Sequence, residues 1–450
     1  MCYQVLFLDA CDRLGMLVML EIFDEWERTE VPEGSGRFFR ERHEGEIAAV
    51  VRRDRNHPSV ILWSIGNEIP ESFARPDIGQ HLRESVRSHD ATRPVTAGIC
   101  QPWWENESWL DWPSSSDPAF EYQDVAGYNY QWANYEPDHE RVPQRVIVGA
   151  ETFPKDIFDG WMLVEKHPWV IGDFVWTAAD YLGESSIGQT FVDTDGVVGF
   201  TFPFHMAVCG DLDLLGRRKP QSYYREAIWR SGVLHMAVHQ PLLPGQREQT
   251  EGWSVRWGWP LVQSHWTWPG HEEEILKVSI YSSCERVRLF LNGRDLGEKP
   301  TTRNERYQAE FEVPYVPGEL RVVGTIHGQR IEHVLRTAGR VAALQLTPDR
   351  TVIRASRNDL AFVDIGVVDE NGIPVPSANN SVRVTVSGAG ELAAIGNANP
   401  VDIDSFRAPE RRAWRGWLQA IVRPGGTAGA IILRAEAESL VPVTVSITTI

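Results

Sequence analysis

The sequence Arg-Asp-Arg-Asn-His-Pro-Ser-Val-Ile-Leu-Trp-Ser-Ile-Gly-Asn-Glu occupies residues 53–68 and decides the fold. Its apolar run, residues 60–63, is opened by Pro58-Ser59 and closed by Ser64 and Gly66. A short continuous apolar run between turn residues is typical of a strand buried on both faces. We therefore predict a parallel strand over residues 60–63.

Glu68 follows this strand at its carboxyl end, next to Asn67. In a β/α barrel the carboxyl ends of the strands form the catalytic face, so a carboxylic acid there is a candidate acid/base. The neighbouring amide can hold a ligand hydroxyl. The alternative is a Glu68 that caps a helix or forms a salt bridge.

The whole stretch resembles the acid/base signature of glycoside hydrolase family 2, which contains β-galactosidases, β-glucuronidases and β-mannosidases. The resemblance implies that Glu68 protonates the glycosidic oxygen and that Asn67 contacts the sugar 2-hydroxyl. His57 lies in the same signature but before the strand, at the end of a barrel that serves stability, and we interpret it as structural.

Composition narrows the class of protein. With 450 residues, 42% of them hydrophobic, the chain is long enough for two to four globular domains. The formal net charge of −18 argues against nucleic acid and anionic membranes as partners and fits a neutral carbohydrate substrate. The 5 scattered cysteines include no Cys-x-x-Cys pair, so we expect buried free thiols and no zinc site. We assign no residues to a metal or a cofactor, and metal dependence stays open.

Targeting signals are not evident in the sequence. There is no run of 18 apolar residues and no basic region at the start of the chain, so we expect neither a membrane span nor a signal peptide. The compartment of a longer parent (cytoplasm, periplasm or outside the cell) and the oligomeric state stay open.

Short apolar runs alternate with helical patterns in the first half of the chain. The strand candidates are residues 16–20, 60–63, 94–97, 125–127, 146–149 and 170–176, and the helix candidates are residues 5–14, 36–53, 77–89 and 155–166. The helix over 5–14 is expected to use Leu6, Leu8 and Leu14 as its apolar face. This alternation indicates parallel βαβ units, hence a doubly wound sheet or a barrel.

Residues 7–19 resemble the helix and third strand of the family 2 barrel. The resemblance implies an N-terminally truncated chain: an incomplete (β/α)8 TIM barrel over residues 1–235 that holds strands three to eight. Because sugar-binding groups and barrel closure would be missing, we expect the chain as written to hydrolyse glycosides poorly or not at all.

The second half changes to an all-β pattern. We expect a linker over 236–269, a β-sandwich over 270–339 and a C-terminal immunoglobulin-like β-sandwich over 340–450, so the fold is multidomain α/β plus all-β. Asn292-Gly293 and Asn371-Gly372 are hairpin signals between alternating segments. Both sandwiches resemble the C-terminal domains of bacterial family 2 enzymes.

Glu151 is the natural partner of Glu68, because it also follows a buried strand, residues 145–150. Retaining glycosidases need two carboxyls roughly 5–5.5 Å apart, one as acid/base and one as nucleophile. Glu151 stands where the family carries its nucleophile. We expect Glu68 to have the higher pKa of the two. A structural Glu151 is the alternative.

Two aromatic residues complete the expected site. The run Asp-Val-Ala-Gly-Tyr-Asn-Tyr, residues 124–130, resembles the sixth-strand segment that supplies a tyrosine next to the nucleophile; Tyr130 is our choice and Tyr128 the competing one. Trp176 matches the family position that stacks on the sugar. Each of these residues could instead be a core aromatic.

The sugar is inferred from the segment around Lys219. Family 2 glucuronidases carry Asn-x-Lys there, whereas Arg217 precedes this lysine by two residues. The resemblance thus favours a β-galactosidase that acts on terminal β-D-galactosides by double displacement. A β-glucuronidase or another family 2 β-glycosidase is second, and an inactive remnant with carbohydrate-binding sandwiches is the alternative from another class.

Overall fold

A computed structural model describes residues 5–29, 32–101, 112–190, 192–193, 202–243, 245–249 and 252–450. The chain divides into two compact units, residues 1–176 and 177–450. None of the described helices combines the length and apolar composition needed to cross a bilayer.

The first unit is built on one sheet of parallel strands. In chain order and in spatial order these are β1 (Val18–Glu21), β2 (Val60–Asn67), β3 (Val95–Ile99), β4 (Ala126–Asn129), β5 (Ile147–Thr152) and β6 (Val170–Val175). Each strand pairs with the next one along the chain, which is the order of a barrel wall, whereas a doubly wound sheet reverses its order. The six predicted strands and the incomplete barrel are confirmed.

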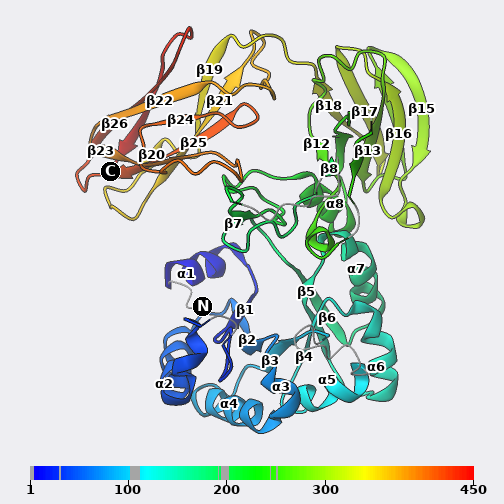
Figure 1. Ribbon diagram of the computed structural model, residues 1–450, viewed down its shortest axis with the longest axis vertical. Helices are drawn as coiled ribbons and strands as arrows, with labels where there is room; N and C mark the ends of the chain where they lie inside the picture. Colours follow the sequence, from blue (N-terminus) through cyan, green and yellow to red (C-terminus); the bar gives the residue numbers. More distant parts are fainter. Residues whose placement is uncertain are drawn as a thin grey trace. The chain divides into compact units, whose positions relative to one another are not determined.

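Helices surround the outer side of this sheet (Figure 1). They are α1 (Val5–Leu14), α2 (Phe39–Asp54), α3 (Glu71–Ala74), α4 (Pro76–His89), α5 (Trp112–Phe120), α6 (Tyr135–Arg141) and α7 (Ile157–Lys166). Four of them were predicted. The others, α3, α5 and α6, are too short for a clear apolar period, and α5 contains Pro118. The expected apolar face of α1 is wrong in part, because Leu8 is buried but Leu6 and Leu14 are exposed.

The strands are buried on both faces. Trp63 and Ile65 of β2 belong to the large core between sheet and helices, while Leu62 packs with Val125 and Val148 in a second cluster. Neighbouring residues of a strand point to opposite faces. This double burial is why the stretch 60–63 is apolar throughout.

The second unit begins with short elements: β7 (Tyr181–Leu182), β8 (Val192–Asp193), β9 (Met206–Ala207), α8 (Pro220–Trp229), β10 (Leu234–His239), β11 (Arg247–Glu248) and β12 (Val262–Gln263). The parallel sheet ends with β6, the last of the six strands expected for the barrel. Residues 177–235, which were expected to belong to the barrel domain, fall in the second compact unit. Strands β10 and β12 are hydrogen-bonded members of the first sandwich. The expected linker over 236–269 is therefore wrong, because its ends supply strands.

The first sandwich consists of two four-stranded antiparallel sheets, in the orders β12-β10-β13-β16 and β15-β14-β17-β18. Its remaining strands are β13 (Ile275–Ser282), β14 (Arg286–Leu291), β15 (Arg294–Pro300), β16 (Gln308–Pro314), β17 (Glu319–Ile326) and β18 (Gln329–Arg336). Asn292 and Gly293, with φ of 49° and 80°, form the predicted two-residue hairpin.

The second sandwich pairs the sheet β19-β21-β25-β23 with the sheet β20-β27-β26-β22-β24. Its strands are β19 (Ala343–Pro348), β20 (Val352–Ile353), β21 (Ala361–Val368), β22 (Ser381–Gly388), β23 (Gly390–Gly396), β24 (Glu410–Arg412), β25 (Trp417–Pro424), β26 (Gly429–Ala437) and β27 (Val443–Thr449). One apolar core lies between the two sheets. Two sheets around one core confirm the expected sandwich.

Candidate active site

Glu68 lies immediately after β2, and its N–H donates to the carbonyl of Gly98 at 2.9 Å. Its φ of 49° lies in the left-handed region, which non-glycine residues rarely adopt. Tyr130, directly after β4, has a φ of 59°. Such backbone conformations concentrate at functional sites. Here both of them, at Glu68 and Tyr130, occur at the carboxyl edge of the sheet.

Asn129 connects Glu68 to Asn67. Its Nδ2 donates to Asn67 Oδ1 at 2.8 Å and to Glu68 Oε1 at 3.1 Å. An ionised carboxylate oxygen can only accept, so the contact with Glu68 turns the Asn129 amide nitrogen toward these two residues. Asn67 Oδ1 thus accepts the hydrogen bond from Asn129.

Gly98 of β3 makes room for these two amides. A Cβ at this position would lie 2.7 Å from Asn67 Oδ1 and 2.8 Å from Asn129 Oδ1, well inside van der Waals contact. Any larger residue would displace Asn67 and Asn129. The pairing register aligns Asn67 with Gly98 and Gly98 with Gly127, which sets the two amides side by side across the sheet.

Glu151 of β5 is held by Tyr130. The Tyr130 hydroxyl donates to Glu151 Oε2, and the Tyr130 N–H donates to the Glu151 carbonyl at 2.7 Å. The Tyr130 ring stacks on Phe153 with centroids 4.3 Å apart. A phenol that donates to a carboxylate stabilises the charged form of that carboxylate.

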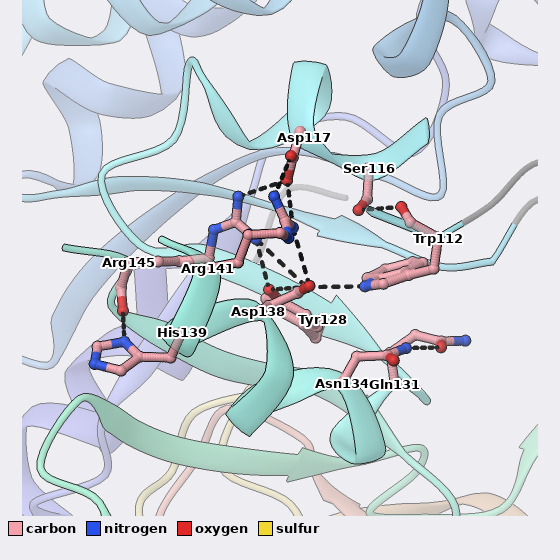
Figure 2. A network of polar contacts seen from close by, with 10 residues as sticks. All are labelled: Trp112, Ser116, Asp117, Tyr128, Gln131, Asn134, Asp138, His139, Arg141 and Arg145. Carbon is pink, nitrogen blue, oxygen red and sulfur yellow. Dashed lines mark hydrogen bonds and ion pairs between the residues drawn. The ribbon is translucent and has the colours of Figure 1, made fainter. Parts of the chain in front are cut away.

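Tyr128, the competing tyrosine, lies elsewhere. It is fully buried, its hydroxyl donates to Asp138 Oδ2 at 2.8 Å, and Arg145 donates to the same hydroxyl at 3.2 Å. Asp138 also accepts from Trp112 and Arg141 (Figure 2). This network joins α5 and α6 to β4, so the Tyr128 hydroxyl is engaged with Asp138 and Arg145, whereas the Tyr130 hydroxyl is the one that contacts Glu151.

Cys100, which follows β3, lies close to both carboxylates. Burial raises the pKa of its thiol well above the ordinary value, and a charge interaction and a hydrogen bond with Glu68 and the charge of Glu151 raise it further. The four described cysteines are buried and free, as predicted, while Cys2 lies outside the described residues.

Glu21, the last residue of β1, adds a third acid to this edge. Burial raises its pKa to about 7, against the effect of the hydrogen bond from Ser64, and the charges of Asp24 and Glu68 raise it further. Glu21 is therefore half protonated near neutral pH, which limits the negative charge beside Glu68.

The two remaining residues discussed from the sequence, Trp176 and His57, lie at opposite ends of the strands. Trp176 follows β6, and its N–H donates to the Thr152 carbonyl at 3.0 Å, so it stands at the same edge of the sheet as Glu151. His57, expected to be structural, contacts Asp12 through Nδ1 at 2.7 Å at the opposite, amino end of β2. Asp12 also accepts the Ser59 N–H at 2.9 Å.

Known families match three segments of the chain. Residues 2–107 match "Glycosyl hydrolases family 2, TIM barrel domain" and residues 344–446 match "Glycoside hydrolase family 2 C-terminal domain 5". Residues 273–332 match a domain of unknown function. The chain belongs to glycoside hydrolase family 2.

Individual family 2 proteins resemble nearly the whole chain. A solved structure of a family 2 member from Bacteroides cellulosilyticus has a TM-score of 0.91 and 40% identity over 99% of this chain and 56% of its own. "Beta-galactosidase BoGH2A" of Bacteroides ovatus is 29% identical over 96% of this chain and 54% of its own length. A "Beta-glucuronidase" of Formosa agariphila is 24% identical over 74% of this chain and 32% of its own length. The chain thus spans about half the length of the first two relatives.

Sequence reasoning missed Asn129, Cys100 and Glu21. Each stands at the carboxyl end of its strand, the same rule that selected Glu68 and Glu151. Applying that rule to every polar residue after or at the end of a strand would have found them. The rule does not distinguish a residue that touches substrate from one that orients its neighbours.

Proposed function

We propose that the protein hydrolyses β-glycosides with retention of configuration, with Glu151 as nucleophile and Glu68 as acid/base. The observation that carries the proposal is that both residues stand at the carboxyl edge of one parallel sheet, where Asn129 donates to Glu68 and Tyr130 donates to Glu151. Retaining glycosidases use two such carboxyls about 5–5.5 Å apart. Membership of family 2 supports the same reaction.

In the first step Glu151 attacks the anomeric carbon and forms an ester, while the glycosidic bond breaks and Glu68 gives its proton to the departing oxygen. Because Glu68 Oε1 accepts from Asn129, the transferable proton is carried by Oε2. In the second step Glu68 takes a proton from water, and this water displaces Glu151 from the sugar. Tyr130, through its hydroxyl, stabilises the Glu151 carboxylate when it leaves.

Asn67 and Trp176 complete the proposed sugar site. The Asn67 amide nitrogen is proposed to donate to the sugar 2-hydroxyl, since Asn67 Oδ1 accepts from Asn129. Trp176, at the same edge, is proposed to stack on the pyranose face. Hydrogen bonds to the 2-hydroxyl strengthen in the transition state and supply part of the catalysis.

A β-D-galactoside is the proposed substrate. Lys219, which would have to hold a uronate carboxylate, donates to Asp180 at 2.8 Å and to the Val208 carbonyl at 2.7 Å. The guanidinium of Arg217 lies 3.4 Å from the centroid of the Trp417 ring. Both cations are thus engaged within the second unit. The relatives that cover nearly the whole chain carry both names, beta-galactosidase and putative beta-glucuronidase, so the choice of sugar rests on the engagement of these cations.

The experiment compares aryl β-D-galactoside and aryl β-D-glucuronide with the same leaving group, using the protein at its native length. We expect a higher kcat/KM for the galactoside, and we expect proton NMR to show the β-anomer of the sugar first. A preference for the glucuronide would reverse the choice of sugar only. Early appearance of the α-anomer would contradict the retaining mechanism itself.

A further inference from the structure

A group of three metal-ligand side chains lies on α2 and α4, which pack side by side (Figure 1). His43 and Glu44 belong to α2, and His81 belongs to α4. Their ligand atoms all lie within 4.8 Å of one another. None of the three residues takes part in the candidate active site.

His43 is oriented as a metal ligand would be. Its Nδ1 lies 2.8 Å from the carbonyl oxygen of Phe39, which can only accept, so Nδ1 carries the proton. In that tautomer the lone pair of Nε2 faces His81. Stacking on the Phe39 ring, at 4.9 Å between centroids, fixes the ring plane. Metal-binding histidines almost always donate their second nitrogen in this way.

The separations fit a tetrahedral ion. Zinc bonds of about 2.0–2.1 Å at the tetrahedral angle place two ligand atoms about 3.3–3.4 Å apart. His43 Nε2 and His81 Nε2 are 3.2 Å apart, and His81 Nε2 and Glu44 Oε1 are 3.4 Å apart. The His81 and Glu44 side chains are 50% and 71% exposed, so water can reach the fourth position.

We propose that His43, Glu44 and His81 bind one Zn²⁺ ion, which ties α2 to α4 on the outside of the barrel wall. Two imidazoles and one carboxylate form a ligand set that zinc accepts, with water as fourth ligand. The alternative needs no ion: the His81 Nε2 proton would be shared between His43 Nε2 and Glu44 Oε1, which lie 3.2 Å and 3.4 Å away. The proposal is independent of the glycosidase mechanism.

The test is zinc titration of the untagged, full chain by calorimetry, with Co²⁺ as a second probe whose visible spectrum reports tetrahedral nitrogen and oxygen ligands. We expect one ion per chain and a raised thermal unfolding midpoint. Loss of a residue that only hydrogen-bonds to a metal ligand already weakens metal binding about 10–100-fold. Loss of a ligand itself, as in His81→Gln or Glu44→Gln, should therefore weaken zinc binding at least about tenfold. Both side chains are exposed, and neither substitution disturbs the core.

Two matched variants serve as controls. His89→Gln changes another histidine of α4 and should leave the affinity unchanged. Asp9→Asn changes the other group of possible ligands among the described residues, Asp9, Asp12 and His57, and should also have no effect. Absence of saturable binding, or binding that survives His81→Gln but is lost in Asp9→Asn, would overturn the proposal.

Discussion

The side-chain nitrogen of Asn129 lies 3.1 Å from Glu68 Oε1, while the backbone of Asn129 pairs in register with Glu151. One residue therefore orients the proposed acid/base and stands beside the proposed nucleophile. A hydrogen bond to a charged group contributes about 1.5–3 kcal/mol, so its loss corresponds to roughly 10–100-fold in rate.

Asn129→Ala tests this positioning role. We expect kcat/KM to fall about 10–100-fold for glycosides with poor leaving groups, and much less for activated aryl glycosides that depart without a proton. The measurement is a series of aryl glycosides that differ only in leaving-group pKa. An equal loss across the series would mean that Asn129 does not act through Glu68.

Gly98→Ala should displace the amides of Asn67 and Asn129, because the new Cβ would lie 2.7 Å and 2.8 Å from their oxygens. We expect a lower kcat/KM and a stability loss of about 1–3 kcal/mol from overpacking. Gly172→Ala in β6 is the matched control, since a Cβ there meets no atom within 4 Å. If both variants behave alike, the crowding at Gly98 has no consequence for the site.

Replacing Tyr128, in β4, and Tyr130, directly after β4, should have opposite effects on stability and on kcat. Tyr128→Phe removes a buried donor from Asp138 and should cost about 1–3 kcal/mol of unfolding free energy, with little change in kcat. Tyr130→Phe removes the donor to Glu151 and should lower kcat with little change in stability. Denaturant unfolding and steady-state kinetics of both variants check this, and a reversed pattern would reassign the tyrosines.

Glu21 should make stability depend on pH. Its pKa is about 7 in the folded protein and about 4.5 when exposed, so the folded state disfavours the charged form. Relative to Glu21→Gln, the wild type should lose up to about 3 kcal/mol of unfolding free energy as pH rises from about 4.5 to 7. Urea unfolding of both proteins across this range measures the difference, and parallel pH profiles would show that Glu21 is not desolvated.

Much of the fold could be predicted because the barrel strands are buried on both faces. The apolar runs of β2, β5 and β6 show no helical periodicity that would compete with a strand. Asn292-Gly293 predicts a two-residue hairpin because both residue types adopt positive φ readily. Residues 177–269 could not be placed in this way. Their strands are two to six residues long, and β10 gains its role only by pairing with β13, a partner distant in sequence.

Part of the candidate site can be located in the sequence, because its residues follow the carboxyl ends of predicted strands. Glu68, Glu151 and Tyr130 follow from position and resemblance, but the role of Asn129 depends on the register that aligns β2 to β5. The cysteine pattern suggested no zinc site, and the histidine pair of α2 and α4 arises only when the two helices pack. Contacts between separate elements are invisible to local patterns.

The most direct test of the account is to identify the residue that carries the sugar during turnover. The protein at its native length is treated with an activated 2-deoxy-2-fluoro-β-D-galactoside, and the labelled peptide is sequenced by mass spectrometry. We predict that the sugar is esterified to Glu151, that Glu151→Gln abolishes labelling, and that Glu68→Gln still labels because the activated group departs without a proton. A sugar trapped on any residue other than Glu151 would contradict the proposed mechanism.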